Sequence, residues 1–589
     1  MKAQSAYRIT ILHVLLLAFV STGAIADAET RPLLLDRDAK AVASDLNVLL
    51  PKLMGDGRVP GLQIALIRDG SIVWSGAFGV TNATSRAPVT SETIFEAASL
   101  TKPFFAYLVM KLVDEGVVNL DTPIVDYVPH EEIEKAMGHP LDYPGFRRDW
   151  LEKITPRHVL SHSSGLPHGE GGKPYPIFFE PGTQYRYSAD GYYFLQLAVE
   201  RLKGKTLDVL MKDYVIDPLG MTHSSMVWRD SYEKTMANGH DQFGAPQDFR
   251  KRNEANAAAS LYTTASDYAR FVRAVMNGEG LKAATWKEML TPQIAVDKDR
   301  GLEWSLGFCL QTDANGKAFW QWGDYGIFRN YVIAYPGRKI GVVYLANSFN
   351  GLAVCRELVA RSIGGEARGV EFLKYLPYDS PVLSFLWALQ DQGPGSVEKI
   401  LSAMIAEHPD LLSAESLRMI IGLLDNGGRY DEIIAVFKSV DGKVPPSAAA
   451  DAALAGAYLG KGDLADAKAC YLKALASPNK EDFDSTRVEW RMTFINALEG
   501  PVKLEADYLK SLAGNYGARH ITFKDGKLYY LRDNVAAKDP RELIPMSKDA
   551  FVIRELPFFR LRFEIGQGGT PTKIIGMYEG GATDESLRD

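Results

Sequence analysis

Cysteine is scarce in this sequence. Its 589 residues include only Cys309, Cys355 and Cys470. Three thiols do not build the framework of a disulfide-rich secreted domain, and one of them must stay unpaired. A Cys309–Cys355 disulfide is an open alternative in an oxidising compartment, although we favour two buried free thiols. The sequence therefore excludes a scaffold held together mainly by disulfides.

An excess of basic residues is also absent. The chain has 66 Lys and Arg against 73 Asp and Glu, for a formal net charge of −7. Nucleic-acid-binding proteins carry a basic patch or stripe, so we expect no nucleic-acid partner. The histidines show no metal-ligand spacing either, since His168 and His240 lack a partner pattern. We therefore expect neither a metal nor a cofactor.

Long apolar runs are missing except near the N-terminus. Positive charge there precedes the apolar segment from Ile9 to Val20, and Ala24-Ile25-Ala26 has the small-x-small pattern of a cleavage site. These features predict a signal peptide over residues 1–26. An uncleaved anchor is the alternative, but the segment is short for a membrane span. We expect a periplasmic or secreted protein with no stable membrane span after signal cleavage.

What the sequence does contain is the size and composition of a multidomain folded protein, with 46% hydrophobic and 24% charged residues. Up to about residue 365, a hairpin pattern over 61–79 comes first and strand-like runs come last, with helices between them. This order predicts one antiparallel sheet built from both ends of the domain. The expected late strands are 304–310, 318–322, 330–335 and 340–347. Residues 154–166 are expected to form a helix.

Two later segments share one spacing. The pattern from Gly428 to Phe437 recurs from Gly462 to Tyr471, at an offset of 34 residues. A period of 34 with this pattern resembles tetratricopeptide repeats, which are stacked helix pairs. We therefore predict a helical repeat domain over residues 395–500 and expect it to offer a surface to a protein partner.

The last part of the chain alternates short strand-like runs with turns. Examples are Ile521–Tyr530, Phe559–Phe563 and Lys573–Tyr578. This alternation predicts a small antiparallel β-sheet or barrel domain over residues 505–585. The expected fold class is thus multidomain: an α+β unit with an antiparallel sheet, then helical repeats, then a small β domain.

The stretch Ser99-Leu100-Thr101-Lys102 carries the strongest chemical signal. Residues three apart share one face of a helix, so the Ser99 hydroxyl and the Lys102 amine point the same way if a helix begins there. A serine needs an adjacent base to act as a nucleophile, and a lysine serves as that base when burial lowers its pKa. The N–H groups of a helix N-terminus also favour an oxyanion. Alone, Ser-x-x-Lys is more typical of a capped helix with an exposed lysine.

Three downstream stretches change that balance. Tyr187-Ser188-Ala189 precedes a predicted helix, and Gln321-Trp322-Gly323-Asp324 follows a predicted strand. The third stretch contains His158 and His162, which by residue type alone could be ligands or bases. Trp304, Trp320 and Trp322 fit a protein core as well as they fit a substrate-facing wall.

In this order, the stretches 95–102, 158–166, 181–193 and 323–347 resemble the serine β-lactamase-like family, meaning class C β-lactamases, penicillin-binding proteins and related esterases and peptidases. The resemblance covers about residues 38–365 and implies the β-lactamase/transpeptidase-like fold. It implies that Ser99 is the acylated nucleophile, Lys102 a base and Tyr187 a proton relay. It also implies an oxyanion hole made by the backbone N–H group of Ser99 and that of Asp324 or its neighbour. It further implies that the stretch with His158 and His162 is mainly a structural turn.

Two family motifs are changed here. Ala189 stands where the family's Tyr-x-Asn motif has asparagine, which removes an amide expected to hold the lysine and the substrate. The third motif, usually Lys-Thr-Gly or His-x-Gly, falls on Gln321-Trp322-Gly323, and a slip of one residue would put Trp322 first. In either register the first position holds no cation. Arg329 is the candidate to replace the missing charge.

Two functions remain open on these residues. The retained Ser99, Lys102 and Tyr187 favour a serine hydrolase that forms an acyl-enzyme with a small-molecule or peptide acyl substrate. An ester or amide is favoured over a β-lactam, because the cation that pairs with the substrate carboxylate in relatives is missing. The alternative is a non-catalytic, penicillin-binding-like scaffold that uses its helical repeats for protein interaction.

Overall fold

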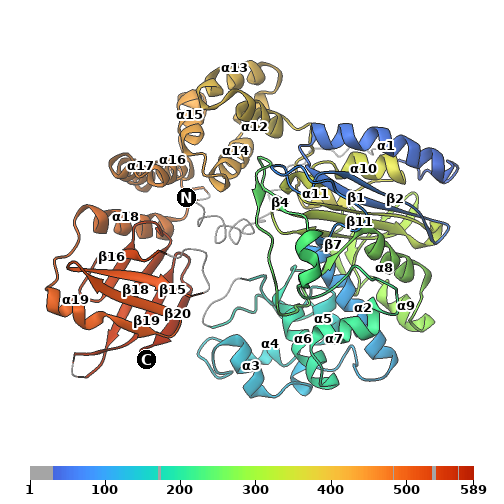
Figure 1. Cartoon of the computed structure of the whole chain (residues 1–589), viewed down its shortest axis with the longest axis horizontal. Helices are drawn as coiled ribbons and strands as arrows, with labels where there is room; N and C mark the ends of the chain where they lie inside the picture. Colours follow the sequence, from blue (N-terminus) through green and yellow to red (C-terminus); the bar gives the residue numbers. More distant parts are fainter. Residues whose placement is uncertain (1–30, 170–173, 482, 534–538, 568) are drawn as a thin grey trace. The chain divides into compact units, whose positions relative to one another are not determined.

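The computed structural model describes residues 31–169, 174–481, 483–533, 539–567 and 569–589. The predicted signal peptide, residues 1–26, lies outside the described residues. The described chain divides into two compact units, one that ends at Trp387 and one that runs from Ala388 to Asp589 (Figure 1). Among the described helices, none has both the length and the apolar character needed to cross a bilayer.

The first unit is built on an eight-stranded antiparallel sheet with the order β2-β1-β12-β11-β10-β9-β8-β7. Its strands are β1 (Gly61–Arg68), β2 (Ser71–Gly79), β7 (Ile294–Asp297), β8 (Leu302–Trp304), β9 (Cys309–Asp313), β10 (Gly316–Asp324), β11 (Arg329–Tyr335) and β12 (Ile340–Ala346). Strand β1 pairs with β12, so that Leu62 lies opposite Ala346. The prediction of one sheet made from both ends of the domain is confirmed.

Helices cover both faces of this sheet, because β1 buries the side chains on both of its sides (Figure 1). Leu62, Ile64 and Leu66 share one core with the leucines of α1 (Ala39–Asp56) and with α10 (Cys355–Ser362). Ala65 and Ile67 face a second core, which contains α2 (Thr101–Asp114) and α8 (Ala265–Asn277). Fully burying a leucine or isoleucine contributes about 1.5–3 kcal/mol. Packing into both cores therefore stabilises β1, the strand with which β12 pairs.

A mostly helical region lies between the two sets of strands. It contains α3 (His130–Met137), α4 (Arg148–Leu151), α5 (Pro156–Leu160), α6 (Asp190–Lys203), α7 (Leu207–Met211) and, after α8, α9 (Ala283–Met289). The predicted helix over 154–166 is wrong beyond Leu160, because His162 and Gly165 adopt positive φ values of 55° and 77° and turn the chain. The predicted strand over 304–310 is also wrong, since Gly307 at φ 106° separates β8 from β9.

The second unit begins with helices. They are α13 (Val397–Glu407), α14 (Ala414–Asn426), α15 (Tyr430–Val440), α16 (Ala448–Lys461), α17 (Leu464–Ala476), α18 (Ser485–Glu499) and α19 (Ala506–Leu512), with α12 (Pro381–Gln392) joining the two units. The recurring pattern falls on α15 and α17, and in both copies its glycine, Gly428 or Gly462, adopts a positive φ just before the helix. The predicted helical region is present, and its identity as tetratricopeptide repeats stays a prediction.

The chain ends in an eight-stranded antiparallel meander, ordered β13 to β20. The strands are β13 (Gly514–Tyr516), β14 (Arg519–Lys524), β15 (Lys527–Arg532), β16 (Arg541–Pro545), β17 (Ala550–Ile553), β18 (Phe559–Ile565), β19 (Pro571–Tyr578) and β20 (Thr583–Leu587). The backbone N–H of Asp589 donates to Asn515 O at 3.0 Å and brings the last strand near the first. Ile544 and Val552 share a core with residues of α16 to α18, so helices and β domain belong to one unit.

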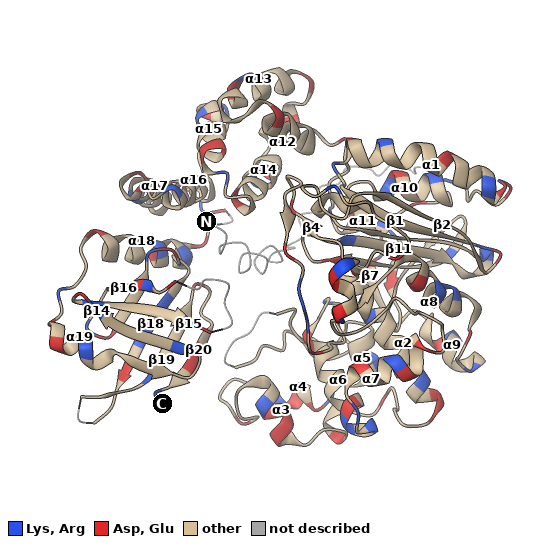
Figure 2. Ribbon diagram, viewed as in Figure 1, with Lys and Arg blue, Asp and Glu red and all other residues tan. Residues whose placement is uncertain are grey.

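The structure shows the pairing state of the three cysteines and the distribution of the charged residues. Cys309, Cys355 and Cys470 are all free, and the first two are buried, so the disulfide alternative is wrong. Figure 2 shows acidic and basic residues interspersed along the helices of both units. Groups of three or more metal-ligating side chains are not found in the described ranges.

Candidate active site

Ser99 lies in a tight turn immediately before α2. Residues Ala98–Leu100 form one 3-10 turn, and the helix starts at Thr101. Ala98 has a φ of 51°, an uncommon conformation for a residue with a side chain, and such strain clusters at functional sites. The turn is pressed against β10, because a Cβ on Gly323 would lie 2.2 Å from Ala97 O. The nucleophile candidate is thus held directly beside the third-motif strand.

Lys102 reaches back to Ser99 from the first turn of α2. Its Nζ lies 3.1 Å from Ser99 Oγ and 3.1 Å from Ala258 O. The side chain is fully buried, and no ion pair to it occurs in the described part of the chain. Burial lowers the pKa of Lys102 to about 7, against a smaller opposing effect of the Asp190 charge. A large fraction of this amine is therefore neutral near pH 7 and able to accept a proton.

Tyr187 lies on the other side of Ser99. Its hydroxyl is hydrogen-bonded with the Ser99 side chain and accepts a hydrogen bond from Gln321 Nε2 at 3.1 Å. Lys102 Nζ is 4.8 Å from the centre of the Tyr187 ring. Burial raises the pKa of Tyr187 well above its ordinary value, and the hydrogen bonds to Ser99 and Gln321 offset only part of that effect. Tyr187 is consequently a protonated phenol near neutral pH and can donate a proton.

Gln321 occupies the first position of the third motif. Its Nε2 donates to Ser99 O at 3.2 Å as well as to Tyr187, whereas the Trp322 ring lies tilted against that of Tyr187 at a centroid distance of 4.7 Å. The geometry therefore favours the register that begins with Gln321. Strand β9 pairs with β10 only as far as Trp320, so on that side residues 321–324 have no strand partner among the described residues. A substrate backbone can pair with such an edge.

Asp324 ends this strand with a partly buried carboxylate that is paired with Arg329. Arg329 Nε lies 3.0 Å from Asp324 Oδ2, the Tyr375 hydroxyl donates to the same oxygen, and the Gly326 N–H donates to Oδ1 at 2.6 Å. Burial alone would raise the pKa of Asp324, but the Arg329 charge and these hydrogen bonds hold it below its ordinary value. Arg329 therefore neutralises Asp324 and is not free to replace the missing third-motif cation.

Tyr375 is the site residue that the sequence analysis missed. It lies after α11 (Arg368–Phe372) and beyond the expected domain end at residue 365. Its hydroxyl contacts a residue 51 positions earlier in the chain. No motif or periodicity surrounds it, so only the tertiary structure places it beside β10.

His162 packs under Tyr187. Its Nδ1 accepts a hydrogen bond from Ser188 N at 3.0 Å, and its ring lies 4.3 Å from that of Tyr187. Burial lowers the pKa of His162 well below its ordinary value, so the ring is neutral. Ala189, the residue that replaces the family's asparagine, is the N-cap of α6 and supplies no side-chain hydrogen bond there. The chain thus positions Tyr187 through a tilted ring contact with His162 and through the backbone hydrogen bond from Ser188 to His162.

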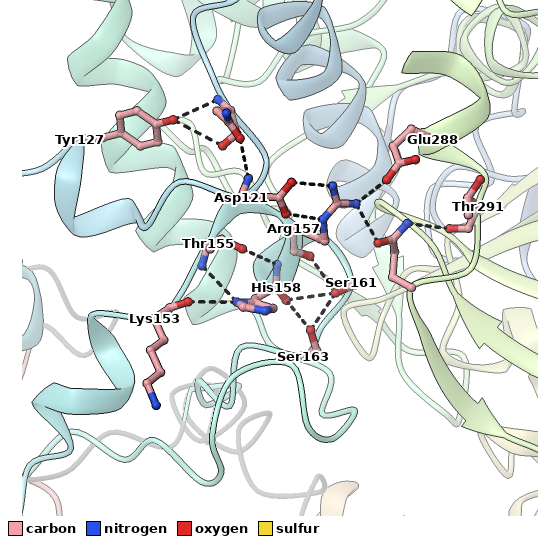
Figure 3. A network of polar contacts seen from close by, with 12 residues as sticks. Asp121, Tyr127, Lys153, Thr155, Arg157, His158, Ser161, Ser163, Glu288 and Thr291 are labelled. Carbon is pink, nitrogen blue, oxygen red and sulfur yellow. Dashed lines mark hydrogen bonds and ion pairs between the residues drawn. The ribbon is translucent and has the colours of Figure 1, made fainter. Parts of the chain in front are cut away.

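His158 stabilises the start of α5 (Figure 3). Thr155 Oγ accepts from His158 N, and His158 Nδ1 accepts from Thr155 N, each at 3.3 Å, which forms a capping box at the start of α5. The adjacent Arg157 pairs with Asp121 at 2.6 Å and also with Glu288. These contacts anchor the turn that carries His162. Within the described residues, the hydrogen bonds of the His158 side chain are with Thr155 and Lys153, and none involves Ser99.

Comparison with known proteins gives one family match and several relatives. The family described as Beta-lactamase matches residues 46–361, which is more than half of the chain. The chain is 25% identical to the unguisins hydrolase ungD of Aspergillus violaceofuscus, over 56% of this chain and 66% of that protein. It is 25% identical to the esterase EstB of Burkholderia gladioli, over 48% and 82% of the two chains.

Two further similarities are to a penicillin-binding protein and to a solved class C β-lactamase structure. Penicillin-binding protein 4 of Amycolatopsis lactamdurans is 26% identical, over 54% of this chain and 88% of its own. The solved structure of a class C β-lactamase aligns at 20% identity with a TM-score of 0.46, over 55% of this chain and 98% of that chain. The chain belongs to the Beta-lactamase family.

Proposed function

We propose that this protein is a serine hydrolase that cleaves an ester or amide through an acyl-enzyme on Ser99. The observation that carries the proposal is the buried Lys102 amine, 3.1 Å from Ser99 Oγ, with a pKa of about 7. An exposed lysine in a capped helix would keep its ordinary charge. The buried environment of Lys102 therefore favours a catalytic base over a helix-capping motif with an exposed lysine.

The first half-reaction uses Ser99 and Lys102. Neutral Lys102 accepts the hydroxyl proton as Ser99 Oγ attacks the substrate carbonyl carbon, which converts the carbonyl oxygen into an oxyanion. The backbone N–H groups of Ser99 and Asp324 are the proposed donors to that oxyanion. As the tetrahedral intermediate collapses, the carbon–leaving-group bond breaks and the acyl group stays on Ser99.

Tyr187 is the proposed proton donor to the leaving group. Because Gln321 Nε2 donates to the phenol oxygen, the phenol proton points away from Gln321 and is available on the Ser99 side. A third-motif cation in the position of Gln321 would favour a tyrosinate, whereas a neutral amide does so less. A proton then passes from the Lys102 ammonium to the Tyr187 phenolate, which restores both groups. Water attacks the acyl carbonyl carbon while neutral Lys102 accepts a water proton, and the bond from the acyl carbon to Ser99 Oγ breaks as Oγ takes that proton, which releases the acid and restores Ser99.

The favoured substrate is a neutral ester or a small amide rather than a β-lactam. Gln321 carries no charge to pair with a substrate carboxylate, and Arg329 is already paired with Asp324. We also propose that the protein is exported to the periplasm or outside the cell, as the pattern over residues 1–26 predicts.

The test is covalent labelling of the full chain with a fluorophosphonate probe. Wild-type protein should be labelled and should hydrolyse a p-nitrophenyl ester, and Ser99→Ala should lose both properties. Ser161→Ala, at a buried serine of the same unit that bonds Arg157 O, is the matched control and should still be labelled. Absence of any label on folded wild-type protein would favour the non-catalytic scaffold instead.

A further inference from the structure

The segment that follows the family match is fixed to the sheet of the first unit. Ala367 and Val370 are buried in the same core as Trp320 of β10, and a Cβ on Gly369 would lie 2.5 Å from the Trp320 ring. Tyr375 stands shortly after this anchored part. Its position is therefore set by packing against the strand that carries the third motif.

Tyr375 and Arg329 hold the Asp324 carboxylate from two directions. The Tyr375 hydroxyl donates to Asp324 Oδ2, and the Arg329 guanidinium lies over the Tyr375 ring at 4.9 Å while its Nε contacts the same oxygen. Arg329 is itself fixed, because its Nη1 donates to Phe349 O at 2.7 Å. The carboxylate is thus paired and hydrogen-bonded on Oδ2 and held by the Gly326 N–H on Oδ1.

An unpaired carboxylate at this position would oppose the proposed reaction. The backbone N–H of Asp324 is a proposed oxyanion donor, so negative charge develops next to a residue whose own side chain is negative. Like charges in a buried site repel strongly because the effective dielectric constant is low. A hydrogen bond and an ion pair that withdraw the carboxylate charge therefore stabilise the transition state more than the ground state.

We propose that Tyr375 is a positioning residue of the hydrolase, which acts by holding the Asp324 carboxylate against Arg329 beside the oxyanion site. The inference rests on the proposed function. It assigns part of the active site to a segment beyond residue 361, where the family match ends.

The test is a double-mutant cycle in the full chain. Tyr375→Phe removes one oxygen atom and keeps the ring that packs under Arg329, and it is made in the wild-type and in the Asp324→Asn backgrounds. With a p-nitrophenyl ester, Tyr375→Phe should lower kcat about tenfold in the wild-type background, as expected for one hydrogen bond to a charged group, with KM changed less than about twofold. In the Asp324→Asn background, Tyr375→Phe should change kcat less than about twofold, because the carboxylate charge that the Tyr375 hydroxyl stabilises is then absent.

Tyr378→Phe is the matched control. Tyr378 lies in the same segment, and its hydroxyl has no hydrogen-bond partner in the described part of the chain, so this variant should behave as wild type. The melting temperature of each variant separates positioning from folding, and Tyr375→Phe should melt within about 2 °C of wild type.

Two results would overturn the inference. One is a wild-type kcat in Tyr375→Phe, and the other is an equal loss of kcat in both backgrounds, which indicates a role unrelated to the Asp324 charge. Failure of the proposed function is distinguishable, since wild-type protein would then neither hydrolyse the ester nor take up the fluorophosphonate label.

Discussion

The pH dependence of ester hydrolysis reports directly on Lys102. Its pKa of about 7, lowered from 10.5 chiefly by burial, means that half of the free enzyme holds a neutral amine at pH 7. At pH 5 the neutral fraction falls to about 1%. We therefore expect kcat/KM to rise about tenfold per pH unit up to pH 6 and to level off above pH 8.

Neighbouring groups do not explain such a break. Burial raises the pKa of Tyr187 far above this range, and burial lowers the pKa of His162 well below 6.5, so neither titrates near pH 7. Of Lys102, Tyr187 and His162, only the proposed acylating base Lys102 is thus expected to change charge there. Lowering the pH removes the base form of Lys102 and leaves the protonation of both neighbours unchanged.

The assay is steady-state hydrolysis of a p-nitrophenyl ester between pH 5 and 9, with the rate extrapolated to zero buffer. Lys111→Met is the control, because Lys111 lies on the same helix and burial also lowers its pKa, but it packs against Tyr107 away from Ser99. Its profile should match that of wild type. A wild-type profile that is flat from pH 5 to 8, or that breaks only above pH 9, would refute the role given to Lys102.

Three more predictions follow from the same geometry. Lys102→Met should abolish turnover, yet urea denaturation at pH 7 should show a free energy of unfolding higher by up to about 4 kcal/mol. A lysine whose folded pKa is lowered destabilises the protein below its unfolded pKa, so this gain should shrink as the pH rises toward 10.5. Equal stability of the two proteins at pH 7 would count against the buried environment. A chain that ends after Gln392 should keep ester hydrolysis. A chain that ends after Gly365 should have a kcat at least about tenfold lower, because Tyr375, Ala367 and Val370 are removed. Full activity of the shorter chain would show that this segment is dispensable. Nitrocefin should have a kcat/KM at least about tenfold below that of a short-chain p-nitrophenyl ester, since Gln321 carries no charge and Arg329 is already paired with Asp324. The reverse order would contradict the specificity argument.

Much of the first unit was predictable because its signals are local. The hairpin at Asp69 and Gly70 follows from turn chemistry, and both residues adopt the positive φ that such a turn needs. The spacing of Ser99 and Lys102 predicts that their side chains point the same way, and the structure brings Lys102 Nζ to 3.1 Å from Ser99 Oγ. In each case the decisive residues are neighbours in the sequence.

What the sequence left open depends on long-range packing. The helix expected over 154–166 stops at Leu160, because the turn at His162 is fixed by its contacts with Ser188 and Tyr187 rather than by helix propensity. The choice between Gln321 and Trp322 as the first motif position needed the side-chain directions on β10. Tyr375 carries no local signal at all, and only the folded chain shows its contact with Asp324.

The central claim is that Ser99 carries the acyl group during turnover. Rapid acid quench of full-length protein mixed with a slowly deacylating ester, followed by mass analysis of the intact chain and its peptides, measures this directly. The account predicts one acyl group per chain, located on the peptide that contains Ser99 and absent from Ser99→Ala. Turnover without any adduct, or an adduct on a different residue that persists in Ser99→Ala, would contradict it.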